Sequence, residues 1–170
     1  CKGSLKSRIV YVAAHGDKHR IGEVKLMQLL SAIAEKSEEF KIDGVVLGGC
    51  FVGGYTMDIE DSIKSSRLRW VVGYGADWAP ATQVDCSVIS VMSRVRKDVF
   101  KSRDRLISKL SSALEPFNPY MMIGSDMQEE NVTLQNALTV VVQPVGQGFN
   151  AKEVSNDVWL NHSAVSEDIE

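Results

Sequence analysis

One histidine and one cysteine in this sequence are placed so that they could act together as a base and a nucleophile. His15 directly follows the apolar run 9–14, and Cys50 follows the apolar run 45–47 and two glycines. A thiolate attacks carbonyl carbon, while an imidazole takes up the thiol proton and later protonates the leaving amine. The two residue types therefore supply the chemistry of a thiol hydrolase if the fold brings them together.

Glycines beside both residues favour an oxyanion hole. Such a hole needs backbone N–H groups near the reacting carbonyl, and Gly16 lets the backbone approach without a Cβ in the way. The amides of Gly16 and Cys50 are the candidate donors. Taken singly, a free cysteine is more often core packing, and a histidine at a strand end is more often an ordinary polar group. Only the pair favours catalysis.

The elements that must position this pair form a β-α-β unit. Residues 8–14 have the pattern of a buried strand, residues 21–40 repeat apolar positions at helical spacing, and residues 44–48 form a second strand that ends in glycines. The crossover of such a unit is right-handed and its strands are parallel. His15 and Cys50 are therefore expected at the same edge of the sheet, where parallel sheets bind their ligands.

The rest of the chain continues this alternation. The pattern predicts a short helix at 57–66, a strand at 68–73, helices at 80–100 and 104–114, a loop at 116–131 and a strand at 138–143. We therefore expect an α/β fold of three layers, with helices on both faces of a mostly parallel sheet, over residues 1–150. Residues 151–170 are expected to form a partly ordered tail. Four strands make a small sheet, so part of it is expected from another segment or chain.

Composition narrows the function classes. With 170 residues, 44% hydrophobic and 24% charged, the chain has the make-up of one globular domain. The formal charge of -3 gives no overall basic field, so neither nucleic-acid nor membrane binding is expected. Three cysteines without a CxxC spacing indicate a reducing, cytoplasmic location. The first residue, Cys1, indicates a processed product or one piece of a longer polypeptide.

No metal or cofactor is expected. His15 and His19, four positions apart, could join Cys50 as metal ligands, but no fourth ligand is evident. The glycines of residues 44–54 fit neither the P-loop nor the dinucleotide-binding spacing.

The motifs around the pair resemble those of caspase-like (clan CD) cysteine peptidases. Residues 10–17 read Val-Tyr-Val-Ala-Ala-His-Gly-Asp, and residues 45–53 read Val-Val-Leu-Gly-Gly-Cys-Phe-Val-Gly. Residues 72–78, Val-Gly-Tyr-Gly-Ala-Asp-Trp, resemble the CHAT branch of that group, which includes separase-like proteases. The resemblance covers about residues 8–95. It implies that Cys50 is the nucleophile, His15 the general base and acid, and the Gly16 and Cys50 amides the oxyanion hole.

The chain departs from the family in two places. Gly48 and Gly49 stand where caspases have Gln-Ala, so strict cleavage after Asp is not expected. The family sheet has two strands before the histidine strand, and only residues 1–7 precede it here. The resemblance thus also implies an earlier part of the domain, missing from this chain or supplied by another. A catalytically silent caspase-like interaction module and a flavodoxin-like domain for a small ligand are the alternatives.

Acidic residues past the third strand suggest a pocket for a basic substrate residue. In the related families this segment helps to form the pocket for the residue before the scissile bond. Asp77 with the flat side chain of Trp78 is the main candidate, and Asp85 and Asp17 are further ones. The alternative is that Asp77 lies in a turn and Asp85 caps a helix.

Overall fold

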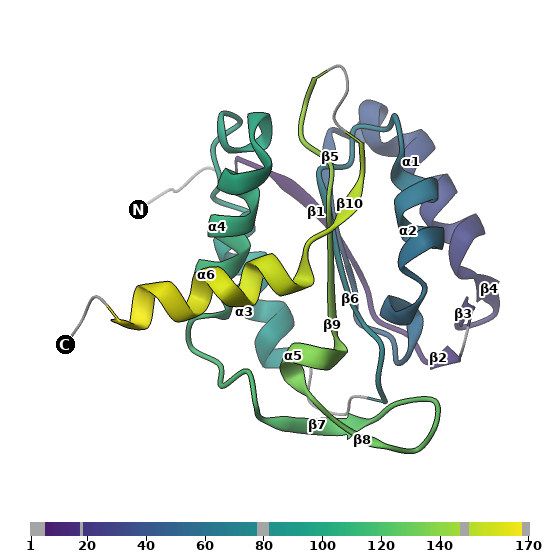
Figure 1. Cartoon of the computed structure of the whole chain (residues 1–170). Helices are drawn as coiled ribbons and strands as arrows, with labels where there is room; N and C mark the ends of the chain where they lie inside the picture. The colour runs from purple at the N-terminus through teal and green to yellow at the C-terminus, as the bar shows by residue number, and fades with distance from the viewer. Residues whose placement is uncertain (1–5, 18, 78–81, 147–149, 168–170) are drawn as a thin grey trace.

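A central sheet of five strands organises the molecule. The computed structural model describes residues 6–17, 19–77, 82–146 and 150–167. The strands of the sheet are β1 (Arg8–Val12), β5 (Ile42–Leu47), β6 (Trp70–Tyr74), β9 (Leu138–Val142) and β10 (Lys152–Glu153). They follow the order β1-β5-β6-β9-β10 (Figure 1). The α/β class expected from the sequence is confirmed, and β10 is a fifth strand that the sequence pattern did not reveal.

The sheet is mixed rather than mostly parallel. β1, β5 and β6 are parallel, whereas β9 runs antiparallel to β6 and β10 runs antiparallel to β9. The chain enters β9 from the edge where β6 ends, since the Gly75 amide donates to the Ala137 carbonyl at 2.7 Å. A strand that starts at this edge must run back antiparallel, because a parallel one needs a crossover to the opposite edge. The prediction of parallel strands therefore holds only for β1, β5 and β6.

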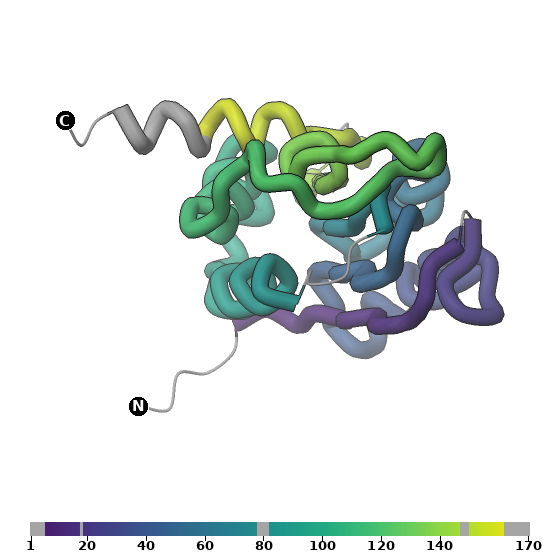
Figure 2. The backbone as a smooth tube through the Cα atoms, turned by 90° about the horizontal axis from the view of Figure 1, so that it is seen from below, coloured from purple at the N-terminus to yellow at the C-terminus, as the bar shows by residue number. Residues whose placement is uncertain are grey.

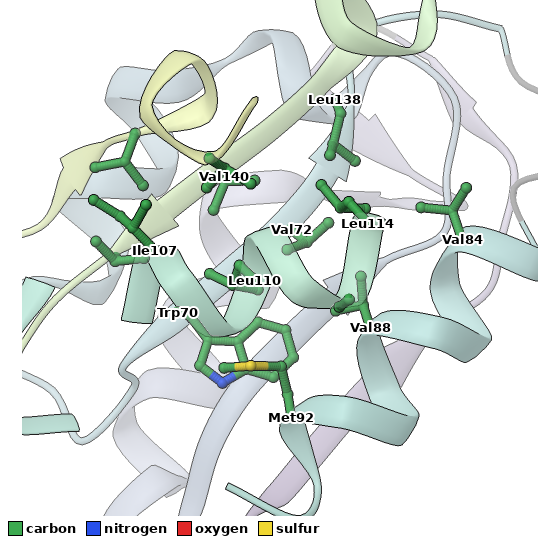
Figure 3. Close-up of a cluster of buried hydrophobic side chains, with 14 of the residues drawn as sticks. Trp70, Val72, Val84, Val88, Met92, Ile107, Leu110, Leu114, Leu138 and Val140 are labelled. Carbon is green, nitrogen blue, oxygen red and sulfur yellow. The ribbon is translucent and has the colours of Figure 1, made fainter. Parts of the chain in front are cut away.

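Helices cover both faces of the sheet. One face is covered by α1 (Leu26–Phe40) and α2 (Thr56–Ile63), and the other by α3 (Thr82–Met92), α4 (Arg103–Leu114) and α6 (Ser155–Glu167) (Figure 1). The second face holds the larger core, in which sheet and helix side chains interlock (Figure 3). Buried there are Trp70, Val72, Val140, Val88, Met92, Ile107, Leu110 and Leu114. The three layers are thus held together by two apolar clusters, one on each side of the sheet.

The helix expected from residue 21 begins later. Residues 16–25 form a small sheet of β2 (Gly16–Asp17), β3 (Arg20–Ile21) and β4 (Val24–Lys25). Gly22 has a φ of 57°, a left-handed conformation that ends regular helix, and its amide donates to the His15 carbonyl at 2.6 Å. The segment after β1 is therefore fixed in a hairpin instead of leading directly into α1.

Two further boundaries differ from the sequence pattern. The helix predicted for residues 80–100 ends at Met92 and is followed by the short η2 (Val99–Lys101). The predicted loop at 116–131 contains β7 (Met122–Ser125) and leads into β8 (Asn131–Thr133) and α5 (Leu134–Ala137). The hairpin escaped prediction because its strands are short and carry Gly, Ser and Asn in place of an apolar period.

The C-terminal segment belongs to the core. Residues 151–170 were expected as a partly ordered tail, but β10 joins the sheet and α6 packs on α4. Val158 is fully buried and Trp159 is 3% exposed. The buried apolar residues described in this segment, Val154, Val158 and Trp159, lie close together in the sequence, so a period over the whole stretch does not show them.

Trp159→Ala should lower the free energy of unfolding by about 3–5 kcal/mol, because it removes a buried indole and leaves a cavity. Leu160→Ala is the matched control, since Leu160 is the next residue and is 70% exposed. Urea unfolding of both variants measures the difference. Equal losses in the two variants would mean that α6 does not pack as described.

Candidate active site

The pairing of β1 with β5 sets His15 and Cys50 at the same level. Val12 of β1 lies opposite Leu47 of β5 in the parallel register, and His15 and Cys50 each lie three residues beyond this pair. Both residues leave the sheet at its carboxyl edge, where ligands of parallel sheets bind. His15 is exposed, and Cys50 is a free thiol of intermediate exposure. Both side chains are accessible to a substrate.

Two glycines bring the loops after β1 and β5 into backbone contact. A Cβ built on Gly16 would overlap the carbonyl oxygen of Cys50 and lie 2.7 Å from the Cys50 amide nitrogen. A Cβ built on Gly49 would lie 3.0 Å from the carbonyl oxygen of Ala14. Only a residue without a side chain fits at 16. The histidine loop is therefore seated directly on the backbone of the cysteine.

The amide of Gly16 is directed away from its own hairpin. In an antiparallel pair, residues that exchange hydrogen bonds alternate with residues that do not. His15 accepts a hydrogen bond from Gly22, so the next pair, Gly16 and Ile21, is the one without hydrogen bonds. The Gly16 N–H consequently points away from β3, which leaves it unused by the hairpin. Its position suits one donor of an oxyanion hole.

Cys50 lies in a sharp, strained turn. The next residue, Phe51, has a φ of 62°, which is rare for a bulky side chain. The Phe51 amide donates to the Ala76 carbonyl at 3.1 Å, and the Val52 amide donates to the Cys50 carbonyl at 2.8 Å. Gly53, in the short helix η1 (Val52–Gly54), packs so closely on Tyr74 that a Cβ would overlap its backbone. The end of β6 thereby holds the cysteine turn in its strained form.

An acidic cavity adjoins this turn. It has a volume of about 570 Å³, and its wall includes Phe51, the neighbour of Cys50. The sequence analysis singled out Asp17 and Asp77, and the fold brings both to this cavity. Trp78 lies outside the described residues. The described residues that line it are Asp17, Phe51, Asp77, Ser125, Asp126, Met127 and Glu129.

The β7–β8 hairpin supplies two acidic residues that sequence reasoning missed, Asp126 and Glu129. The hairpin is fastened to the end of β6, because the Asp77 amide donates to the Ser125 carbonyl at 2.9 Å and the Asp77 carboxylate accepts from the Ser125 amide. Asp126 Oδ1 accepts from the amides of Gln128 and Glu130 at 2.8 and 3.0 Å. The acidic residues after Ser125 were visible in the sequence, but the prediction of a loop there did not indicate where in the fold they lie. The cavity wall holds four carboxylates and, among the described residues, no lysine or arginine.

His19 faces a different neighbour from His15. Its Nδ1 lies 3.4 Å from the carboxylate of Asp58, and its ring stacks on Tyr55 with centroids 3.7 Å apart. These contacts tie the β2–β3 turn to α2. In the described ranges, no group of three or more His, Cys, Asp or Glu side chains is arranged to hold a metal ion.

Asp85 is not at the cavity, which corrects the expectation of a substrate contact. It lies in the first turn of α3, is 1% exposed, and binds two tyrosines from different strands. Tyr11 donates to Oδ2 at 3.0 Å, and Tyr74 donates to Oδ1 at 2.7 Å. Burial raises the pKa of Asp85, and the two hydrogen bonds oppose this shift. Burial and the bond to Asp85 also raise the pKa of Tyr11, to about 12. Asp85 therefore connects α3 to β1 and β6 through its two hydrogen bonds.

Figure 2 views the molecule from below, toward the edge where these parts meet. The β7–β8 hairpin, in green, lies on one side of the view, and the N-terminal strand region, in purple, lies on the other.

Comparisons with protein-family models, with curated proteins and with solved structures find no match for this chain. In the part of the chain that the structure describes, no helix is long and apolar enough to cross a membrane.

Gly16→Ala should lower the free energy of unfolding by about 1–3 kcal/mol, because the new methyl group overlaps the Cys50 carbonyl and the two loops must separate. Gly54→Ala is the control, since a Cβ there lies 3.8 Å from the Cα of Gly75, an ordinary contact. Urea unfolding compares the two. If Gly16→Ala is as stable as Gly54→Ala, the loops are not in contact.

Asp85→Asn should gain stability over the wild type as the pH rises. Because the folded-state pKa of Asp85 is raised, this carboxyl favours folding most below the unfolded-state pKa of about 4, and that contribution is lost as the pH rises through the folded-state pKa. The asparagine does not titrate, and it can still hydrogen-bond to the tyrosines. The difference in unfolding free energy between variant and wild type should therefore grow from about pH 4 upward and then level off.

The control is Glu35→Gln, which removes an exposed carboxyl on α1. Asp85→Ala should be less stable than Asp85→Asn by about 1–3 kcal/mol, because both hydroxyls lose their acceptor. A difference between Asp85→Asn and wild type that stays constant from pH 4 to 8 would contradict the buried position.

Proposed function

We propose that this chain is a cysteine endopeptidase of the caspase-like type, with Cys50 as the nucleophile and His15 as the base. The observation that carries the proposal is the contact of Gly16 with the Cys50 backbone at the carboxyl edge of β1 and β5. This contact sets the residue after the histidine against the backbone of the cysteine, which favours joint use of the thiol, the imidazole and the two backbone amides. Acyl transfer needs these groups together.

The reaction runs in two halves. His15 takes the thiol proton as Cys50 Sγ attacks the peptide carbonyl, and the amides of Gly16 and Cys50 stabilise the oxyanion. Collapse of this intermediate breaks the C–N bond, and the leaving amine takes the proton from His15. A thioester on Cys50 remains. His15 then removes a proton from water, which attacks the thioester, and the acid product leaves as the Cys50 thiol is restored.

The acidic cavity supports cleavage after Lys or Arg. Its wall includes Phe51, next to the nucleophile, and Asp17, two residues beyond His15. A basic side chain would pair with carboxylates that no lysine or arginine among the described residues of the wall neutralises. An acidic side chain would be repelled by those carboxylates, and an apolar one would gain no charged partner.

The proposal extends to location and partners. Cys50 and Cys86 are free, and free thiols fit the reducing cytoplasm.

β1 is the first strand in the sheet order, and within the described residues no strand pairs with its outer edge. We propose that a further protein segment or chain covers this edge, as natural proteins protect such edges, and that it completes the sheet or regulates activity. The substrate is a protein.

A panel of fluorogenic peptides that differ only in the residue before the scissile bond tests the proposal. The wild type should hydrolyse Arg and Lys peptides, and Cys50→Ala or His15→Ala should lower kcat/KM by about 10² to 10⁴-fold. Cys86→Ala is the control thiol, because Cys86 is exposed on α3 and lies outside the proposed dyad. Asp17→Asn should lower kcat/KM for Arg peptides more than for Ala peptides, while Glu35→Gln should not change the ratio.

Three results would count against the proposal. Activity retained in Cys50→Ala would exclude this nucleophile, and cleavage after Asp would exclude the basic specificity. A folded wild type that cleaves no peptide would instead indicate the catalytically silent interaction module.

A further inference from the structure

A second cavity lies beside the same hairpin and is apolar. It has a volume of about 650 Å³, and the side chains that line it include two methionines that the solvent reaches, Met121 at 38% and Met122 at 56% exposure. Among the described residues of its wall there is no charged side chain. The lining consists of Gln83, Val84, Pro116, Phe117, Asn118, Met121 and Met122.

Strand β7 joins this apolar cavity to the acidic one. Met122, at one end of the strand, lines the apolar cavity, and Ser125, at the other end, lines the acidic cavity. Met122 lies opposite Thr133 and Ser125 lies opposite Asn131, two residues apart on β8. An irregularity between Met122 and Gly124 absorbs the additional residue on β7. Met122 and Ser125 are therefore on the same face of the hairpin, because side chains two residues apart share a face.

The spacing of Met122 and Ser125 in the hairpin register fits an extended peptide. Side chains on the same side of an extended chain recur every second residue, at about 7 Å. The step of two residues on β8, from Thr133 to Asn131, spans the same length of about 7 Å. A peptide that places a basic side chain in the acidic cavity thus directs another side chain of the same face toward the apolar cavity.

We infer that the apolar cavity is a second specificity subsite, which binds a large apolar side chain two residues from the basic one in the substrate. This inference rests on the proposed function and adds a second recognition element to it. The volume of about 650 Å³ accommodates Leu, Met or Phe. Methionine side chains adapt to different apolar shapes, so the subsite accepts several such residues.

Ile123, the residue after Met122, shows that β7 directs one side chain into the core and leaves others at the apolar cavity. Ile123 is 5% exposed and belongs to the large apolar core, whereas Met121 and Met122, the two residues before it, are open to solvent. A charged substrate residue would be disfavoured there, because it would lose hydration without gaining a partner. The subsite therefore discriminates apolar from charged residues.

Peptides with Arg fixed before the scissile bond test the inference when Leu, Phe, Ser or Asp is placed in turn at each nearby position on both sides. One position two residues from the Arg should favour Leu or Phe over Ser by about tenfold in kcat/KM. Met122→Asp should remove this preference. Met57→Asp is the matched control, since Met57 is 78% exposed on α2 and outside both cavities, and it should leave the preference unchanged.

Binding of the same peptides to Cys50→Ala, followed by fluorescence polarisation, separates this inference from the proposed function. Hydrolysis after Arg with no apolar preference at any position would overturn the subsite and leave the peptidase intact. If the wild type cleaves nothing, the peptidase is wrong, and binding decides the subsite. An apolar preference that Met122→Asp removes supports the subsite, and equal binding of Leu and Asp peptides overturns it.

Discussion

The contact between two backbones, at Gly16 and Cys50, is the constraint on which the rest of the site depends. It has two causes that lie far apart in the sequence. The parallel pairing of Val12 with Leu47 brings the two strand ends level, and the lack of a Cβ at residue 16 lets the loops close on each other. The small sheet β2-β3-β4 then fixes the histidine loop from the outside, since Gly22 bonds the His15 carbonyl. A fold with the same strands but a side chain at 16 could not close this edge.

The same edge also collects charge from segments that are distant in the sequence. Asp17 comes from the first hairpin, Asp77 from the end of β6, and the remaining carboxylates from the β7–β8 turn. Asp77 has two tasks, because it holds Ser125 through backbone and side chain while it forms part of the cavity wall. Mutual repulsion of these carboxylates is a cost that a bound cation removes. An acidic wall next to the turn that holds Cys50 is therefore more useful for recognition than for stability.

Local pattern was sufficient where one strand or helix is apolar in itself. The runs that became β5 and β6 are continuous and β-branched, so their burial could be predicted, as could the positions of His15 and Cys50 after strand ends. The buried strand expected at residues 8–14 is wrong in one respect, because β1 lies at the edge of the sheet and none of its residues is buried. The direction of β9 could not, because it depends on the edge from which the chain enters the sheet. The sequence around Asp85 does not indicate that this residue is buried either, since its two partners, Tyr11 and Tyr74, come from separate strands. The β7–β8 hairpin is defined by its attachment to Asp77, a tertiary contact.

The rate at which each cysteine is alkylated by iodoacetamide tests the central claim most directly. Cys86 is exposed and Cys50 is not fully so, so accessibility alone makes Cys86 the faster thiol. An imidazole that takes the thiol proton reverses this order. Mass spectrometry of the labelled peptides should show Cys50 reacting faster than Cys86 near neutral pH, and His15→Ala should restore Cys86 as the faster one. A slower Cys50 in the wild type, or a rate unchanged by His15→Ala, would contradict the pairing of His15 with Cys50.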